Sequence, residues 1–289
     1  MSSQQSSSGP VEFRTDWARR AQSAILAAPG RSVICLDFDG TLAPIVEHPQ
    51  DARPLLASMA AIDALAGWIG CIAVVTGRPV ATALELGGFA GLGNAEGLRI
   101  YGQYGAERWD GSNGRVVAPG RPREIGEAIE RIGRLLEEAA AAGEPVAGAR
   151  LEDKNLAVGV HTRSCPEPGA ALAVLEPRLR RLAAGLGLVV EPGRNVIELR
   201  SSALTKGDAV RGLVGELDPV ALAFCGDDAG DIAGFDAVRA WRDEEHPGAV
   251  VVSCSPEVPA LEQQADVLCA GPVGIATWLE GLAGGLRSG

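Results

Sequence analysis

Residues 33–41 read VICLDFDGT, an apolar run of four residues that leads directly into Asp37 and then into a second carboxylate, Asp39. A short apolar run without polar alternation is typical of a strand buried on both faces of a parallel sheet. In open sheets of this kind, ligands bind beyond the carboxyl ends of the strands. The stretch therefore predicts an α/β fold with a functional site where the first core strand ends.

Five further apolar runs have the same character, and segments with helical spacing lie between them. These runs cover residues 71–75, 98–101, 222–225, 249–252 and 267–269, and the first helical segment covers residues 54–65. Strands that alternate with helices predict an α/β core of the doubly wound, Rossmann-like type, built on a parallel sheet.

The middle of the chain has a different pattern. A turn-rich segment at 109–122 is followed by a helix at 124–142, a strand at 151–162, a helix at 165–187 and, within 188–200, two strands joined by a Pro-Gly turn. We therefore expect an inserted α+β cap domain at residues 111–199, between the two halves of a catalytic core at 11–110 and 200–289. The Ser- and Gln-rich residues 1–10 are expected to form a disordered tail.

Composition disfavours several classes of function. A formal net charge of −11 disfavours general binding to nucleic acid or to a membrane surface. The sequence shows no signal-peptide pattern and no apolar run of about 18 residues. We expect a cytoplasmic protein that acts on a small molecule, without nucleic-acid or membrane partners; the oligomeric state is not indicated, and a monomer is favoured. The six cysteines contain no C-x-x-C pair and are expected to be reduced core residues.

Polar residues follow three of the predicted strands. Asp37 follows the first strand, Thr76 the second, and Asp227, Asp228 and Asp231 the fourth. Clustered carboxylates repel one another unless a cation is present, and oxygen ligands of this kind suit Mg²⁺. We therefore expect Asp37 and Asp227 to hold Mg²⁺ at this edge of the sheet.

Such a site is suited to phosphoryl transfer. An aspartate whose charge is masked by the metal can attack phosphorus, and Asp39 can protonate the leaving oxygen and then activate water. Gly40 lets the backbone approach the phosphoryl group and is expected to supply an amide donor. Lys206 stands at a predicted helix start, where its charge opposes the helix dipole, and this placement indicates a nearby anion.

Simpler interpretations stay open for several of these residues. An Asp-Gly pair after a strand is often only a turn. Asp228 and Asp231 could cap the helix that follows them, and Glu152 and Lys154 could form a solvated pair at a strand edge. The sequence contains no P-loop, no H-E-x-x-H and no G-x-S-x-G, so competing hydrolase classes lack their motifs.

Six motifs occur in a defined order along the chain. They are DFDGTLAPIVEHPQDARP (37–54), VVTGR (74–78), YGQYGAE (101–107), LEDKNLAVGVHTR (151–163), VIELR (196–200) and GDDAGDIAGF (226–235). Together they resemble the haloacid dehalogenase superfamily of phosphotransferases and, more narrowly, the trehalose-6-phosphate phosphatases. The resemblance covers roughly residues 30–280.

The resemblance implies a role for each core residue. Asp37 would be the nucleophile and Asp39 the acid/base, with Mg²⁺ held by Asp37, the Asp39 backbone carbonyl and Asp227. Thr76 would hydrogen-bond the transferring phosphoryl group. Lys206 would neutralise that group and would be positioned by Asp228 or Asp231.

The resemblance also implies a sugar site in the cap. Its charged residues, which form strong and directional bonds to hydroxyls, would be Glu152, Lys154, Arg163 and Glu198. The chain departs from the family pattern at Tyr104, which replaces a histidine, and at Thr162, which replaces an aromatic residue. The segment around Asp231 also lacks the usual flanking Thr and Glu. The first two departures bear on the substrate rather than on the chemistry.

The resulting prediction is a Mg²⁺-dependent phosphatase of trehalose biosynthesis that hydrolyses trehalose 6-phosphate through an aspartyl phosphate. Closure of the cap on sugar binding is expected to align the phosphoryl group with the catalytic aspartates. Two alternatives stay open: a phosphatase of another sugar phosphate, such as glucosylglycerol phosphate or sucrose phosphate, and a non-catalytic sugar-phosphate sensor. The complete set of core residues argues against a sensor.

Overall fold

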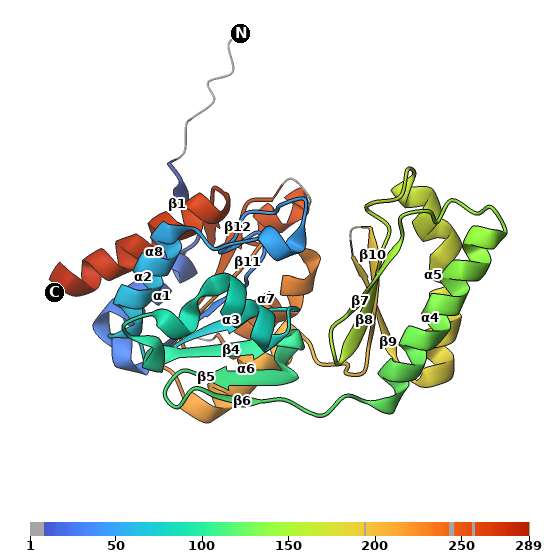
Figure 1. Cartoon of the computed structure of the whole chain (residues 1–289). Helices are drawn as coiled ribbons and strands as arrows, with labels where there is room; N and C mark the ends of the chain where they lie inside the picture. The colour runs from blue at the N-terminus through green and yellow to red at the C-terminus, as the bar shows by residue number, and fades with distance from the viewer. Residues whose placement is uncertain (1–8, 194, 243–245, 256–257, 289) are drawn as a thin grey trace, which may run out of the picture. The chain divides into compact units, whose positions relative to one another are not determined.

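The computed structural model describes residues 9–193, 195–242, 246–255 and 258–288 (Figure 1). The chain forms two compact units, one made of Met1–Val117 and Leu204–Gly289 and the other of Ala118–Ala203. Residues 1–8, which make up most of the predicted tail, lie outside the described residues. The larger unit is therefore assembled from two separate stretches of the chain.

The larger unit is built on a nine-stranded sheet in which the order of strands is β1-β13-β12-β11-β2-β3-β4-β5-β6. The strands from β13 to β4 pair in parallel, whereas β1, β5 and β6 pair antiparallel at the two edges. All six predicted core strands are confirmed. The bounds are β1 Val11–Phe13, β2 Ser32–Leu36, β3 Cys71–Val75, β4 Leu98–Gly102, β5 Glu107–Asp110, β6 Arg115–Val117, β11 Ala221–Gly226, β12 Gly248–Ser253 and β13 Val267–Cys269.

Helices cover both faces of this sheet, as the doubly wound prediction requires. Every residue of β2 is buried, and successive side chains enter opposite layers, so Ile34 and Leu36 belong to one apolar cluster and Val33 and Cys35 to the other. The first layer contains α1 Asp16–Ala27, α2 Leu56–Ala66, α3 Val80–Gly87 and α8 Gly271–Ser288, and the second contains α6 Lys206–Leu217 and α7 Ile232–Trp241. The α/β fold class is confirmed.

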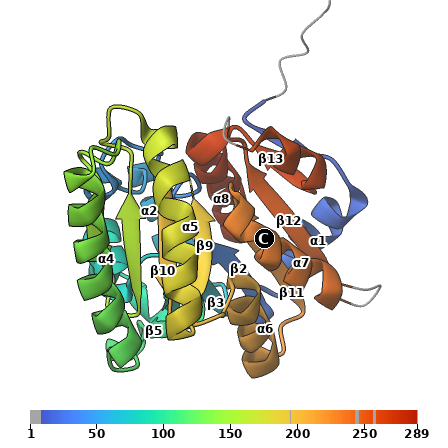
Figure 2. The same ribbon diagram turned by 90° about the vertical axis from the view of Figure 1, so that its right-hand side faces the viewer.

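The smaller unit is a four-stranded antiparallel sheet with two helices on one face, as Figure 2 shows. Apolar side chains of the helices, such as Leu175 and Leu179, form one buried cluster with Val158 and Val160 of the sheet. This cluster gives the unit a core of its own. The elements are α4 Arg123–Ala141, β7 Arg150–Asp153, β8 Ala157–His161, α5 Pro168–Leu186, β9 Val189–Gly193 and β10 Val196–Arg200, and the order of strands is β7-β8-β10-β9.

Three local predictions differ from the structure. Residues 151–162, predicted as one strand, form the hairpin β7–β8, because Asn155 turns the chain with a φ of +67°. Pro192 and Gly193 are not a turn but lie in β9, opposite Ile197 and Val196. The turn-rich segment after Trp109 contains the hairpin β5–β6, which extends the larger sheet, so residues 111–117 belong with that unit.

The cysteines and the helices fit the expected character of the chain. All six cysteines have free thiols, and five of them are buried. Burial raises the pKa of the Cys35 and Cys225 thiols well above the ordinary value, so neither thiol is a ready nucleophile. Among the residues that the structure describes, no helix combines the length and the apolar character needed to cross a membrane.

Candidate active site

The candidate site lies where three neighbouring parallel strands end. Leu36 of β2 pairs with Val74 of β3 on one side and with Cys225 of β11 on the other. The amide of Asp37 continues this ladder and donates to the Cys225 carbonyl over 2.9 Å. Because the three strands run in the same direction, the segments that follow them emerge at one edge of the sheet, the edge formed by the carboxyl ends of the strands.

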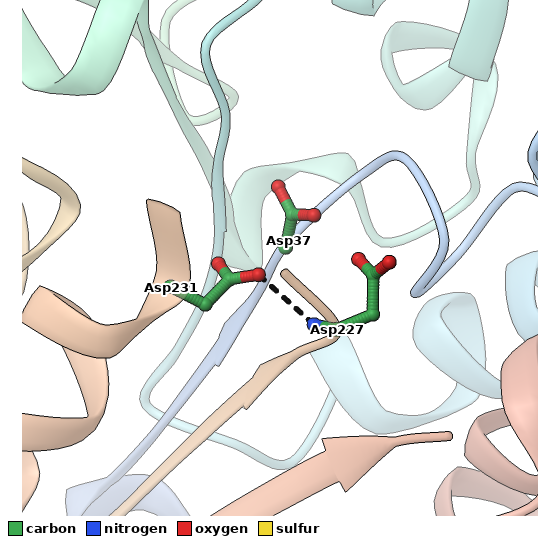
Figure 3. Close-up of side chains that lie close together, drawn as sticks. All are labelled: Asp37, Asp227 and Asp231. Carbon is green, nitrogen blue, oxygen red and sulfur yellow. Dashed lines mark hydrogen bonds between the residues drawn. The ribbon is translucent and has the colours of Figure 1, made fainter. Parts of the chain in front are cut away.

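Three buried carboxylates gather at this edge. Asp37, Asp227 and Asp231 each offer a carboxylate oxygen, and these oxygens all lie within 4.8 Å of one another. Figure 3 shows Asp37 and Asp227 side by side at the ends of their strands, with Asp231 reaching towards them from the next turn of chain. Two of the three, Asp37 and Asp227, are the predicted metal-binding pair.

Asp231 is fully engaged by its own chain. Its Oδ2 accepts the amides of Asp227, over 2.9 Å, and Asp228, over 3.1 Å, while its Oδ1 accepts the Lys206 ammonium over 2.7 Å. A carboxylate with both oxygens bound in this way fixes the geometry of the loop after β11. Asp231 is therefore a positioning group for Asp227 and Lys206, whereas Asp37 and Asp227 keep oxygens that can accept a metal ion.

Lys206 is buried at the first position of α6, as the sequence predicts. Thr205 caps the helix together with Asp208, and the Lys206 Nζ donates to Asp37 Oδ1 over 2.6 Å. Burial acts to lower the pKa of Lys206, but the charges of Asp231 and Asp37 outweigh it and raise the pKa well above the ordinary value. The raised pKa favours the charged ammonium beside Asp37.

Burial and mutual repulsion perturb the carboxylates. Burial, followed by the charge of Asp231, raises the pKa of Asp37 well above the ordinary value and that of Asp227 to about 8, although Lys206 opposes both shifts. Burial also raises the pKa of Asp231 to about 6. Three carboxylates thus face one ammonium. A bound cation would offset the burial and the mutual repulsion that raise these pKa values, and the oxygen-only donor set fits Mg²⁺.

The loop after β2 closes on itself around Gly40. The amides of Leu42 and Ala43 donate to the Phe38 carbonyl, and the Gly40 amide donates to the Ala43 carbonyl over 2.7 Å. The prediction that Gly40 supplies an amide donor to the phosphoryl group is therefore wrong, because this amide is already bound within the turn. Gly40 serves instead to let the loop pass close to Asp227.

We expect Gly40→Ala to lower kcat/KM for the predicted phosphate release about 100-fold and to lower the free energy of unfolding by about 2 kcal/mol. Gly40 has a φ of +77°, and a Cβ at this position would lie 2.0 Å from Asp227 Oδ2, so the carboxylate must move. Gly88→Ala is the control, because Gly88 has a φ of +65° but no atom within 4 Å of its Cβ position. Thermal unfolding and steady-state kinetics separate strain from displacement of Asp227; equal losses in both variants would contradict the steric explanation.

Thr76 and Asp228 occupy different environments. Thr76 is buried, and its Oγ1 accepts the Arg78 amide over 3.1 Å, which leaves the hydroxyl hydrogen as a donor for a ligand. Asp228 is exposed and stands at the N-cap position of the short helix Ala229–Asp231. Of the two residues proposed to position Lys206, the structure thus brings Asp231 and not Asp228 into contact with it.

Three further residues at this edge received no role from the sequence. Arg78 donates twice to the carboxylate of Asp39, Thr41 Oγ1 donates to Asp227 Oδ1 over 3.4 Å, and Ser253 Oγ donates to the Gly40 carbonyl over 2.7 Å. Thr41 and Arg78 stand inside the DFDGT and VVTGR motifs, so the motifs could have indicated them. Ser253 could have been found only from its place at the end of a predicted strand.

Three of the four predicted sugar-binding residues meet on one face of the smaller sheet. Glu152 and Glu198 both lie opposite Gly159, and the Lys154 Nζ is 2.5 Å from Glu198 Oε2 and 3.7 Å from Glu152 Oε2. Glu198 is buried, and its Oε1 has no hydrogen-bond partner among the described residues. A buried carboxylate oxygen in this state is an acceptor for a ligand hydroxyl.

Two more residues of the smaller unit complete this description. No role was expected for His161 from the sequence, yet its Nε2 lies 2.8 Å from Glu152 Oε2 on the same polar face. Arg163, the fourth predicted sugar-binding residue, is exposed in the turn after β8. The structure thus adds His161 to the group of residues around Glu152.

The two departures from the family pattern have different consequences. Thr162 is buried, and its hydroxyl donates to the Asn195 carbonyl over 3.3 Å, so this side chain is part of the packing of the smaller unit. Tyr104 adopts a φ of +61°, and its ring lies so close to Gly77 that a Cβ there would be 2.9 Å from the Tyr104 hydroxyl. Of the two, Tyr104 is the one placed next to the loop that carries Thr76.

Known proteins match this chain in sequence and in structure. The model of the trehalose-phosphatase family matches residues 35–266. A probable trehalose-phosphate phosphatase of Sinorhizobium fredii is 33% identical over 232 residues, which are 78% of this chain and 79% of the relative. The crystal structure of a trehalose-6-phosphate phosphatase related protein has a TM-score of 0.67 and 25% identity, and the match covers 89% of this chain and 100% of that one.

Other relatives are much longer than this chain. An uncharacterized glycosyl hydrolase of Mycobacterium tuberculosis is 34% identical over 221 residues, which are 72% of this chain. The match spans only 15% of the length of that relative. The matched region is therefore a module that also occurs within larger proteins.

Proposed function

Because the chain belongs to the trehalose-phosphatase family, we propose that it is a Mg²⁺-dependent phosphatase that hydrolyses trehalose 6-phosphate to trehalose and inorganic phosphate. The resemblance to trehalose-6-phosphate phosphatases of the haloacid dehalogenase superfamily is confirmed by the family match and the relatives. The observation that carries the proposed chemistry is the placement of buried Asp37 beside Lys206 and Asp227 at the ends of β2 and β11.

The reaction would proceed in two displacements. A carboxylate oxygen of Asp37 attacks phosphorus, and the bond between phosphorus and the sugar oxygen breaks as Asp39 gives that oxygen a proton. Asp39 then takes a proton from water, the water oxygen attacks phosphorus, and the bond to Asp37 breaks. Phosphate leaves, and both aspartates return to their starting states.

The neighbouring groups would stabilise the charge of the phosphoryl oxygens. Lys206 is fixed 2.6 Å from Asp37 Oδ1, so its charge lies beside the reacting oxygen without any rearrangement. The Thr76 hydroxyl hydrogen is a further donor. Mg²⁺, held by Asp37, Asp227 and the Asp39 carbonyl, would supply additional positive charge and would neutralise the repulsion between the carboxylates.

Recognition of the sugar would fall to the polar face of the smaller unit. The Glu198 Oε1 without a partner supports this assignment, because a sugar hydroxyl is the kind of donor that it lacks. Glu152 and Lys154 border the same position, and Arg163 would add a donor from the turn after β8. Tyr104 departs from the family pattern and lies next to the Thr76 loop. This residue could therefore make another sugar phosphate the preferred substrate.

Phosphate release from a panel of esters tests the proposal. We expect Mg²⁺-dependent release with kcat/KM higher for trehalose 6-phosphate than for sucrose 6-phosphate, glucose 6-phosphate or glucosylglycerol phosphate. Glu198→Gln should lower kcat/KM for the preferred ester by about 10- to 100-fold, the value of a hydrogen bond to a charged group, and should leave p-nitrophenyl phosphate hydrolysis unchanged.

The panel also distinguishes the alternatives. Glu176→Gln is a matched control, because this carboxylate lies on α5 and pairs with Arg180. Preference for another ester would retain the chemistry and replace the substrate. Absence of release from every ester, together with binding of a sugar phosphate, would favour a sensor.

A further inference from the structure

Arg78 holds the carboxylate of Asp39 at two points. Its Nε donates to Oδ2 and its Nη2 donates to Oδ1, each over 2.6 Å. A planar guanidinium bound to both oxygens fixes the orientation of the carboxylate as well as its position. Within the described part of the chain, Arg78 provides all the hydrogen bonds of the Asp39 side chain that the structure shows.

Arg78 is itself held from several sides. Its Nη2 also donates to the Pro49 carbonyl over 2.9 Å, and its guanidinium carbon lies 5.2 Å from the centre of the Phe38 ring. Its amide donates to Thr76 Oγ1, and its carbonyl accepts the Gln103 amide. The side chain is only 13% exposed, whereas that of Asp39 is 37% exposed. The more exposed carboxylate is therefore fixed by the less exposed arginine.

Without this contact, Asp39 would lack a defined orientation. It stands in the turn after β2, and its side chain has two free torsions once Arg78 is removed. A group that must exchange a proton with a particular oxygen loses efficiency when it samples several rotamers, because the donor and acceptor must approach within hydrogen-bond distance.

We propose that Arg78 is the positioning residue of Asp39, and that it contributes to the reaction through Asp39 alone. This inference depends on the proposed function, in which protonated Asp39 gives its proton to the leaving oxygen; in that acid form one Asp39 oxygen would carry the proton and Arg78 would hold the other. The guanidinium of Arg78 contacts the Pro49 carbonyl and the Phe38 ring, and the Arg78 amide donates to Thr76. Three separate parts of the chain therefore set the direction of the Asp39 carboxylate.

A leaving-group comparison separates this role from a merely structural one. The alkoxide that leaves a sugar phosphate needs a proton, whereas p-nitrophenolate leaves without one. The parameter kcat/KM covers the steps up to departure of this group. An arginine that acts through Asp39 therefore matters for the sugar ester and much less for the aryl ester, whereas an arginine that binds the phosphoryl group or maintains the fold matters equally for both.

The experiment uses Arg78→Lys, which keeps the positive charge but cannot form the planar fork. We expect kcat/KM for the sugar phosphate that the wild-type enzyme hydrolyses fastest to fall by about 10- to 100-fold, and kcat/KM for p-nitrophenyl phosphate to change by less than about threefold. Asp39→Asn should show the same selectivity with a larger loss. The double variant should be no slower than Asp39→Asn, because Arg78 then has nothing left to position.

A control and two outcomes complete the design. Arg53→Lys alters an exposed arginine that donates to the Gln50 and Ala52 carbonyls, and its kcat/KM should stay within about twofold of wild type. Equal losses on both esters in Arg78→Lys, or additive losses in the double variant, would overturn the role inferred for Arg78 and would leave the proposed function in place. A wild-type enzyme that hydrolyses neither ester would overturn the proposed function, and this inference with it.

Discussion

Asp37→Asn will abolish phosphate release while the protein stays folded. We expect kcat to fall by about 10⁶-fold, the order of loss found when a covalent nucleophile is removed. The amide is nearly the same size as the carboxylate but cannot attack phosphorus. It also removes one of three carboxylates that crowd a buried site, so we expect the melting temperature of the metal-free protein to be unchanged or higher.

The measurement combines steady-state phosphate release with acid quenching of the reaction. Wild-type protein should carry acid-stable, hydroxylamine-labile phosphate during turnover, and Asp37→Asn should carry none. Asp236→Asn is the control, because this exposed aspartate of α7 pairs only with Arg239 among the described residues. An undiminished rate in Asp37→Asn would remove the covalent mechanism, whereas a lost rate together with lost structure would leave the nucleophile to be tested with Asp37→Glu.

Lys206→Met will have the largest effect on stability. We expect urea-induced unfolding of the metal-free protein near neutral pH to show a loss of about 3–5 kcal/mol, as when one partner of a buried ion pair is removed. The ammonium bridges Asp37 Oδ1, at 2.6 Å, and Asp231 Oδ1, at 2.7 Å, and all three side chains are almost fully buried. Methionine fills similar space but leaves the carboxylates without a counter-charge.

A surface pair supplies the matched control for Lys206→Met. Arg211→Met removes the exposed partner of Asp208 on the same helix and should cost less than about 1 kcal/mol. Adding Asp37→Asn to Lys206→Met should recover part of the stability, because one buried charge is removed. A loss of the same small size in both single variants would contradict the view that Lys206 neutralises the site.

Short-range patterns were sufficient to predict the frame of the site. The apolar run before Asp37 identifies β2, and the similar run before Asp227 identifies β11, so the sequence could place both carboxylates at the same edge of the sheet. Lys206 could be placed at a helix start because Thr205 and Asp208 form a local capping pattern. These predictions depend on residues that are close together in the chain.

Contacts between separate loops could not be predicted in this way. Asp228 and Asp231 are both carboxylates at the start of one helix, and only the path of the loop decides which of them reaches Lys206. The Gly40 amide is unavailable because the turn closes on Ala43, and the bond between Arg78 and Asp39 joins loops from two strands. Each of these outcomes depends on the distance between side chains after folding.

The discontinuous construction of the larger unit sets an order of events during protein synthesis. The segment Ala118–Ala203 is continuous and has its own core, so it can fold as soon as it leaves the ribosome. Strand β2, in contrast, must wait for β11, whose residues emerge almost 190 positions later, since Leu36 pairs with Cys225. Nascent β2 is an apolar strand with one unpaired edge throughout this delay, and this interval is when aggregation competes most strongly with folding.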